Sequence, residues 1–350
     1  MLSPMGKVLM LCFILSICYL QLFYISAENT WLAPALYVFG DSTVDPGNNN
    51  NLPTRAKANF LPYGIDFNNT PTGRFTNGMT IADCVATLLG LPFPLAYMNL
   101  SETERSKIST GLNYGSSCGI LPETGSSEGS CLTLDKQIDL FKSTTNNDML
   151  RENLEMHLSK SIFFISIGPN DYFLNYFKNS SDISKLFSPD EFAKFLINEL
   201  AKRLQILYEL GARKFLLNGI GPLGCTPGMI NSTQHEGECV EFINKVVNLY
   251  NVELSTKLLY LQSQLPGSLF THSDNFQHFQ DMKESHETYG ITNINSTRWI
   301  PNQALCLARD KYLFFDAFHT SGGANMIYAR RCFNETSICI PLNIMQLASA

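Results

Sequence analysis

The sequence predicts an α/β fold with a mainly parallel central sheet, on the evidence of three buried-strand patterns and one long amphipathic helix. The candidate strands, residues 36–39, 162–167 and 215–217, are short apolar runs bounded by glycine or polar turn residues. Such runs are typical of strands that are buried on both faces of a parallel sheet. Because the sequence shows no internal repeat and no linker, we expect a single domain over residues 28–350.

The clearest helix is expected over residues 189–210, immediately before the third strand. Ser188 can cap it, Pro189 suits its first turn, and Glu191 completes a capping box. Apolar residues recur at helical spacing along one face, at Phe192, Phe195, Leu196, Leu200, Leu204 and Leu207. Gly211 ends the helix, so this segment is the helix-to-strand half of a βαβ unit. Further helices are expected over residues 80–89 and 240–262.

Composition narrows the class of protein. The chain has 350 residues, of which 45% are hydrophobic and 16% are charged, so it can form a large core and is not a disordered chain. Its net charge is −6 and it has no basic stripe, so we expect no nucleic acid as a partner.

The N-terminus, residues 1–27, has the pattern of a secretory signal peptide. Lys7 precedes an apolar run that extends to Ile25, and Ser26 and Ala27 provide a small-residue cleavage site. A membrane anchor is the alternative, because the run is long for a signal, but an anchor needs no such site. We therefore expect a secreted chain that keeps no stable membrane span after the signal is removed.

Sequons and cysteines agree with export. Asn-x-Ser/Thr sequons, which are acceptors for N-glycans, occur at Asn68, Asn99, Asn179, Asn231, Asn295 and Asn334. Eight cysteines follow the signal, and an even number in an exported chain suggests disulfides of open connectivity. Local loops are plausible for Cys118/Cys131, Cys225/Cys239 and Cys332/Cys339, with Cys84 and Cys306 remaining. No CxxC pair occurs and the six histidines are scattered, so no metal site is expected.

Ser42 is the candidate nucleophile, because Gly40-Asp41-Ser42 directly follows the first strand. Ligands of parallel α/β sheets bind beyond the carboxyl ends of the strands. A serine hydroxyl is a weak nucleophile and needs a base. The tripeptide alone is common, and a turn or helix-capping serine is the alternative interpretation.

Two distant segments could complete such a site. Asp316 precedes His319 by three residues, so the carboxylate could orient the imidazole while His319 moves the Ser42 proton. Asn170, in the Gly-Pro-Asn-Asp turn after the second strand, could donate to the oxyanion of an acyl-transfer intermediate. Each segment alone also fits a structural role, as a hydrogen-bonded pair or an ordinary turn.

Two Gly-x-Ser-x-Gly segments, residues 115–119 and 125–129, match the nucleophile-elbow pattern of α/β-hydrolases. That elbow needs a strand before the serine and a helix after it. Pro122 and Gly125 forbid a helix after the first segment, and the second lies in a Gly/Ser-rich loop. We therefore reject both as nucleophile elbows.

Taken jointly, these motifs resemble the plant GDSL esterase/lipase branch of the SGNH hydrolases. Further matching segments, at residues 47–49, 71–78, 111–114, 210–214 and 219–225, extend the resemblance over nearly all of the mature chain. The resemblance implies a three-layer α/β/α flavodoxin-like fold, secretion to the cell wall or apoplast, no cofactor, and hydrolysis of carboxylic esters. It also implies that Asn170 and the Ser42 backbone N–H are oxyanion donors.

The sequence departs from that family at two places. The glycine-bearing block at residues 111–119 is one residue short after Tyr114, so the backbone N–H that completes the oxyanion hole stays unassigned. Thr320 stands where the family often has proline after the histidine, which affects local rigidity more than chemistry.

Three functions are compatible with these observations. The first is hydrolysis of acyl esters by a Ser42–His319–Asp316 triad through an acyl-enzyme. The second is acyl transfer to an alcohol by the same site, and the third is ligand binding without turnover by a secreted glycoprotein. Lipid, cutin-like polyester, acetylated sugar and phenolic esters all remain open as substrates.

Overall fold

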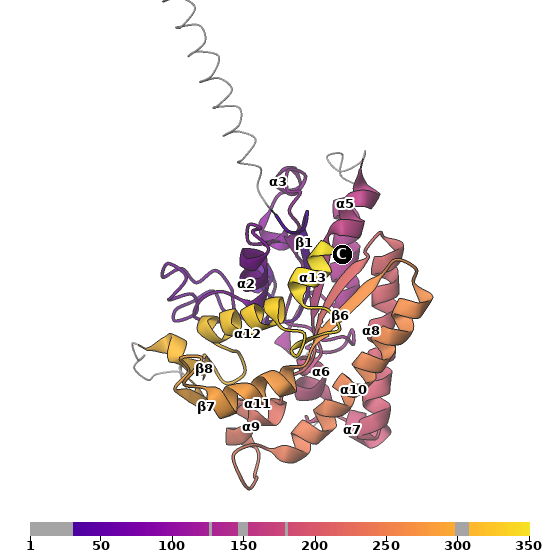
Figure 1. Ribbon diagram of the computed structural model, residues 1–350. Helices are drawn as coiled ribbons and strands as arrows, with labels where there is room; N and C mark the ends of the chain where they lie inside the picture. The colour runs from indigo at the N-terminus through magenta and orange to yellow at the C-terminus, as the bar shows by residue number, and fades with distance from the viewer. Residues whose placement is uncertain (1–30, 126–127, 146–152, 179–180, 298–307) are drawn as a thin grey trace, which may run out of the picture.

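The computed structural model describes residues 31–125, 128–145, 153–178, 181–297 and 308–350 (Figure 1). The expected signal peptide, Asn179, Cys306 and the side chain of Asn295 lie outside this described part. No helix within it is long and apolar enough to cross a membrane.

The strands of the main sheet are short, and two of the central ones end beside the candidate site. They are β1 (Leu36–Gly40), β2 (Leu95–Ala96), β3 (Leu112–Asn113), β4 (Ile162–Ser166), β5 (Lys214–Asn218), β6 (Leu269–Ser273) and β9 (Cys339–Ile340). A separate two-stranded sheet pairs β7 (Asn293–Thr297) with β8 (Tyr312–Phe314). The predicted strands are thus confirmed within a residue or two at each end.

The helices connect and cover these strands. They are α2 (Ile81–Leu88), α3 (Glu102–Arg105), α4 (Leu134–Thr145), α5 (Leu154–Lys160), α6 (Pro169–Asp171), α7 (Ile183–Leu186), α8 (Pro189–Glu209), α9 (Pro227–Ser232), α10 (Glu241–Gln264), α11 (Asn275–Ser285), α12 (Gly322–Asn334) and α13 (Ile344–Ser349). The predicted helices at 80–89, 189–210 and 240–262 are confirmed as α2, α8 and α10. The Ser188–Glu191 capping box of α8 is present.

Sheet topology confirms the predicted fold class. Within the described residues the main sheet runs β2-β3-β1-β4-β5-β6-β9, and all of its pairs are parallel except β6 with β9. When β1, β3, β4, β5 and β6 are numbered 1 to 5 in chain order, their order across the sheet is 2-1-3-4-5. This is the flavodoxin-like arrangement. The chain changes direction across the sheet between β1 and β4, which is where ligands bind in such folds.

Side chains of β1 alternate between two cores, as the period of a strand requires. Tyr37 and Phe39 pack with residues of α4, α8 and α10, whereas Leu36 and Val38 pack with residues of α2, α12 and α13. Helices therefore cover both faces of the sheet, which gives three layers (Figure 1).

The three local disulfides form as proposed from spacing. Cys118–Cys131, Cys225–Cys239 and Cys332–Cys339 are bonded, with Cα–Cα distances of 5.7, 4.5 and 5.0 Å. Cys84 is buried as a free thiol. Among the described residues, the group of possible metal ligands formed by Cys225, Cys239 and Glu241 has both of its sulfurs in a disulfide.

Candidate active site

Gly40 sets the path of the chain into the turn that carries Ser42. Its φ is +152°, and a Cβ at this position would lie 2.1 Å from the Ser166 carbonyl oxygen, so only glycine fits. The buried Gln137 amide of α4 accepts from Gly40 N at 2.8 Å and donates to Gly40 O at 2.9 Å. Asp41 N then donates to Ser166 O at 2.9 Å. The turn is thereby fixed to the end of β4.

Ser42, His319 and Asp316 lie in one continuous hydrogen-bonded chain. The Ser42 hydroxyl is 2.8 Å from His319 Nε2, although the two residues are 277 positions apart. His319 Nδ1 lies 2.7 Å from Asp316 Oδ2 and 2.9 Å from Oδ1. With Nδ1–H donating to the carboxylate, Nε2 is free to accept from Ser42. The structure thus brings these three predicted residues together.

Asp316 is held by more groups than its histidine. Its Oδ1 accepts from the backbone N–H groups of Phe318 and His319 at 2.8 and 2.7 Å. Its Oδ2 accepts from the Tyr63 hydroxyl at 2.8 Å. Tyr63 was missed by the sequence reasoning, because it lies 253 residues away in a loop with no motif of its own. The 71–78 block contributes as well, since the Phe75 ring lies 5.1 Å from the His319 ring.

Electrostatics set the protonation states of the pair. Burial by itself would lower the pKa of His319, but the charge of Asp316 and its hydrogen bond raise it above the ordinary value. Burial would raise the pKa of Asp316, yet His319 and the two backbone donors hold it below the ordinary range. Asp316 is therefore ionised when His319 titrates, as an orienting carboxylate must be.

Asn170 is the second residue of α6, just after the carboxyl end of β4, and lines the same cavity as Ser42 and His319. Its Nδ2 donates to Cys118 O at 3.0 Å and lies 3.4 Å from Ser117 O. An amide nitrogen carries two hydrogens, so one remains weakly engaged. No hydrogen bond links Asn170 to Ser42 among the described residues, in contrast to the close chain that joins Ser42, His319 and Asp316.

Asp171, which follows Asn170, fixes the loop that Asn170 contacts. Its buried carboxylate accepts from Ile120 N at 2.7 Å, Leu121 N at 3.0 Å and the Thr124 hydroxyl at 2.7 Å. Burial raises the pKa of Asp171 to about 6. The residues that follow the 111–119 block are thus tied to α6, and Cys118 of the block is bonded to Cys131, which precedes α4.

Backbone donors in the 115–119 segment can be accounted for one by one. Three of the five donate to protein acceptors, namely Gly115 N to Asn113 Oδ1, Ser116 N to Gly40 O and Cys118 N to Ser116 O. Within the described chain, Ser117 N and Gly119 N have no protein acceptor, and neither has Ser42 N. Of these three residues, Ser42 lines the cavity.

The first elbow-like segment offers no competing nucleophile among the described residues. The central serine of the first segment, Ser117, is buried, and its hydroxyl accepts from Asn49 Nδ2 at 2.7 Å. No helix follows it directly in the described chain, as predicted. The central serine of the second segment, Ser127, lies outside the described residues. Thr320, in place of proline, has its carbonyl bound by the Thr76 hydroxyl at 3.0 Å, which restrains the chain after His319.

A cavity of about 290 Å³ adjoins Ser42 and His319. Most of its wall is apolar and comes from the ends of β4 and β5, from α6, α11 and α12, and from the loop before α12. Ligand pockets of this kind bury an apolar group and orient it with a few polar contacts. Phe318 lies at this wall and is 46% exposed, with its ring 5.1 Å from that of Phe173.

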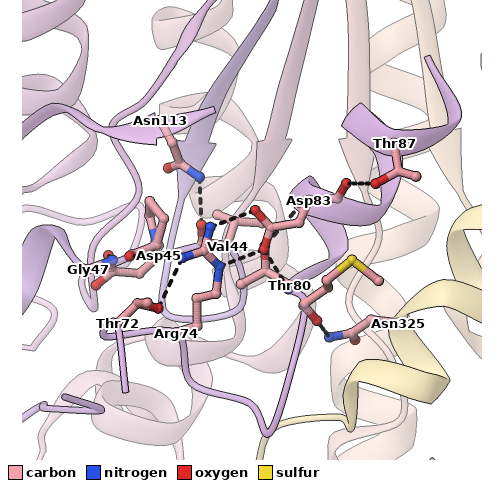
Figure 2. A network of polar contacts seen from close by, with 12 residues as sticks. Val44, Asp45, Gly47, Thr72, Arg74, Thr80, Asp83, Thr87, Asn113 and Asn325 are labelled. Atoms are coloured by element: carbon pink, nitrogen blue, oxygen red, sulfur yellow. Dashed lines mark hydrogen bonds and ion pairs between the residues drawn. The ribbon is translucent and has the colours of Figure 1, made fainter. Parts of the chain in front are cut away.

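A second polar group, which we name the Arg74 cluster, consists of Thr72, Arg74, Thr80 and Asp83 (Figure 2). Arg74 binds both oxygens of Asp83 at 2.8 Å, and the two side chains are 7% and 1% exposed. Asp83 also accepts from the backbone and hydroxyl of Thr80, which caps α2. Arg74 is followed by Phe75 and Thr76, which contact His319 and Thr320, so the cluster anchors one wall of the site.

Comparisons with known proteins agree with this geometry. The sequence profile of the GDSL-like lipase/acylhydrolase family matches residues 36–331. GDSL esterase/lipase 7 of Arabidopsis thaliana is 38% identical over 98% of this chain and 99% of its own length. GDSL esterase/lipase At1g71691 of the same plant is 37% identical over 91% of this chain and 86% of its own length. The chain belongs to the GDSL-like lipase/acylhydrolase family.

Proposed function

We propose that this chain is a secreted serine esterase/lipase that hydrolyses carboxylic esters through an acyl-enzyme on Ser42. One observation carries the proposal, namely the unbroken chain from Ser42 Oγ through His319 to Asp316 at the edge of an apolar cavity. Family membership supports the reaction class, since both relatives are named GDSL esterase/lipase.

Each residue of the site has a separate role in the proposed hydrolysis. Ser42 Oγ attacks the ester carbonyl carbon while His319 Nε2 takes the hydroxyl proton, and Asp316 stabilises the resulting imidazolium. The carbonyl oxygen becomes an oxyanion, for which Ser42 N–H and the Asn170 amide are the proposed donors. His319 then gives its proton to the leaving alkoxide. Water, deprotonated by His319, releases the acid, and the proton returns to Ser42.

For a third oxyanion donor, two backbone N–H groups of the 111–119 block are our candidates. Gly115, Ser116 and Cys118 donate elsewhere, so the N–H of Ser117 or Gly119 is the candidate from the shortened block. Ser117 precedes the carbonyl that Asn170 binds most closely, and its own hydroxyl accepts from Asn49 at 2.7 Å. Three such donors are a common complement for a tetrahedral intermediate.

Ser42→Ala tests the nucleophile. It should lower turnover of a short-chain p-nitrophenyl ester by about 10⁴-fold or more without changing thermal unfolding. A fluorophosphonate probe should label the unmodified protein at Ser42, as mapped by mass spectrometry, and should not label the variant. Ser263→Ala, at an exposed serine of α10, is the control and should keep both activities. Retained turnover in Ser42→Ala would overturn the proposal, and product analysis with an added alcohol separates hydrolysis from transfer.

Secretion and glycosylation belong to the same proposal. Among the sequon asparagines, Asn68, Asn99, Asn231 and Asn334 are exposed, so their side chains are open to modification. Expression in a plant or insect secretory system should yield a medium protein that begins near Glu28 and loses mass on treatment with an N-glycosidase. Retention of residues 1–27 in the recovered protein would contradict cleavage of the signal.

A further inference from the structure

One wall of the cavity carries a polar group that the proposed reaction does not use. His278, on α11, lines the cavity but forms no hydrogen bond with Ser42, His319 or Asp316 in the described chain. It is 8% exposed, and its ring packs edge-on against Tyr328 of the neighbouring helix α12, with centroids 5.3 Å apart (Figure 1). A buried histidine in a mostly apolar wall calls for a partner.

The orientation of the ring fixes which nitrogen carries the proton. Arg331 donates from Nη1 to His278 Nδ1 at 3.3 Å. Arg331 is itself held by Asp281 at 2.5 Å and Glu335 at 3.0 Å, so this donor is firmly positioned. Burial, and then the charge of Arg331, lower the pKa of His278 to about 4. The ring is therefore neutral near pH 7, with Nδ1 as acceptor and Nε2–H as donor.

His278 Nε2–H has no hydrogen-bond acceptor in the described chain. It is also not one of the unpaired side-chain atoms that are fully buried. Asn275, one helical turn earlier on α11, also lines the cavity. Its Nδ2 donates to Gly219 O at 2.6 Å, while its buried Oδ1 has no partner in the described chain. His278 Nε2–H is thus an unused donor of this wall, whereas Asn275 Oδ1 is enclosed by the protein.

From this arrangement we infer that the cavity selects esters whose acyl group is apolar but carries an oxygen that accepts from His278 Nε2–H. A hydroxyl or an ether oxygen can accept this hydrogen bond. A plain alkyl chain would leave the donor unpaired. The inference rests on the proposed ester hydrolysis at Ser42.

The test compares p-nitrophenyl esters of ω-hydroxy, ω-methoxy and unsubstituted alkanoic acids over a series of chain lengths. At the length that reaches His278, we expect the hydroxy and methoxy esters each to exceed the unsubstituted ester in kcat/KM by about 3- to 10-fold. A 4-hydroxyphenylalkanoate and its phenyl counterpart distinguish a phenolic from an aliphatic hydroxyl. Equal kcat/KM for all three series at every length would overturn the inference.

Variants assign the preference to His278. His278→Phe keeps a ring against Tyr328 but removes the donor, so the preference for oxygenated esters should vanish while unsubstituted esters are still hydrolysed. His278→Gln keeps a donor and an acceptor for Arg331, and it should retain part of the preference. Phe279→Leu, a cavity residue on the same helix, is the control and should change both ester classes alike.

The outcomes separate the two proposals. If His278 only supports Arg331, its replacement lowers thermal stability and slows all esters equally, which would overturn the inference. Fluorophosphonate labelling of each variant shows whether the Ser42 site is still formed. Absence of turnover of every ester by the labelled, folded wild-type protein would overturn the proposed function and this inference with it.

Discussion

The Arg74 cluster and the Ser42 site adjoin the same segment of chain, yet their buried polar atoms are paired differently. In the cluster, both carboxylate oxygens of Asp83 accept hydrogen bonds from Arg74, and one of them also accepts from Thr80. At the site, the N–H groups of Ser42, Ser117 and Gly119 have no acceptor in the described chain. A buried donor without a partner is costly, so such groups are retained where a ligand completes them.

This difference in pairing separates the buried groups that stabilise the fold from those that are available for chemistry. Arg74 and Asp83 face one another and are sealed from the cavity, so they serve the fold. His319 faces Asp316 on one side and Ser42 on the other, so its second nitrogen remains available for a proton. Replacements in the two regions should therefore change different measured quantities.

The largest effect is expected from Asp316→Asn, which breaks the site while leaving the Arg74 cluster intact. The amide favours the wrong imidazole tautomer and removes the charge that stabilises the imidazolium, so kcat should fall by about 10⁴-fold. Thermal unfolding should change much less. Loss of only a few-fold in kcat would show that Asp316 does not orient His319.

The same variant gives a pH test with a defined sign. His319 acts as a base only when neutral, so in the wild type kcat/KM should rise with pH, with a midpoint above the ordinary value of about 6.5. In Asp316→Asn the main group that raises the pKa of His319 is gone, only the weaker influence of Asp41 remains, and burial, which lowers this pKa, dominates. The midpoint should then move below that of the wild type, and an upward shift would contradict this account.

Asp83→Ala breaks the Arg74 cluster, so its main expected effect is on stability. It leaves a buried guanidinium without its carboxylate and removes the cap partner of Thr80, so unfolding free energy should fall by about 3–5 kcal/mol. Asp182→Ala is the matched control, because its pair with Lys185 is 76% exposed on both sides and should change stability by at most about 1 kcal/mol. Urea unfolding measures both.

A double replacement sharpens this result. Arg74→Met with Asp83→Leu removes both charges together and should recover much of the stability lost by Asp83→Ala. Equal destabilisation by the single and double variants would show that the ion pair itself, rather than an unpaired charge, determines the loss.

The smallest effect is expected from Tyr63→Phe, which removes one of the donors to Asp316. The backbone donors remain, so kcat should fall by only about 3- to 10-fold with KM little changed. Without this donor the carboxylate is less stabilised by neighbours, so the pH midpoint of His319 should rise slightly. Tyr260→Phe, at an exposed tyrosine, is the control and should change neither quantity.

The sequence was sufficient to predict the parts of the fold that have a strong period. The apolar runs of β1, β4 and β5 and the capped, amphipathic α8 stand out because burial on two faces or on one helical face leaves a pattern. The strands β2, β3 and β9 have only two residues each, which is too short for any period, and β9 pairs antiparallel. These short strands depend on tertiary contacts and were not predicted.

The site also contains residues that the sequence predicted and residues that it did not. Ser42, Asp316 and His319 could be predicted to meet because each lies in a motif placed after a strand, although their roles remain predictions. Tyr63 and His278 could not, because nothing near them in the chain marks the distant group that each contacts. That the N–H groups of Ser117 and Gly119 have no protein acceptor in the described chain could be learned only from coordinates.

The Cys118–Cys131 disulfide has a practical consequence. It closes the loop whose Cys118 carbonyl receives the Asn170 amide, so the geometry of that loop depends on an oxidised pair. A recombinant host that folds the chain in its reducing cytosol would deliver thiols at these positions. We expect such material to be soluble in part but poorly active. Periplasmic or secretory expression of the same gene should yield active enzyme.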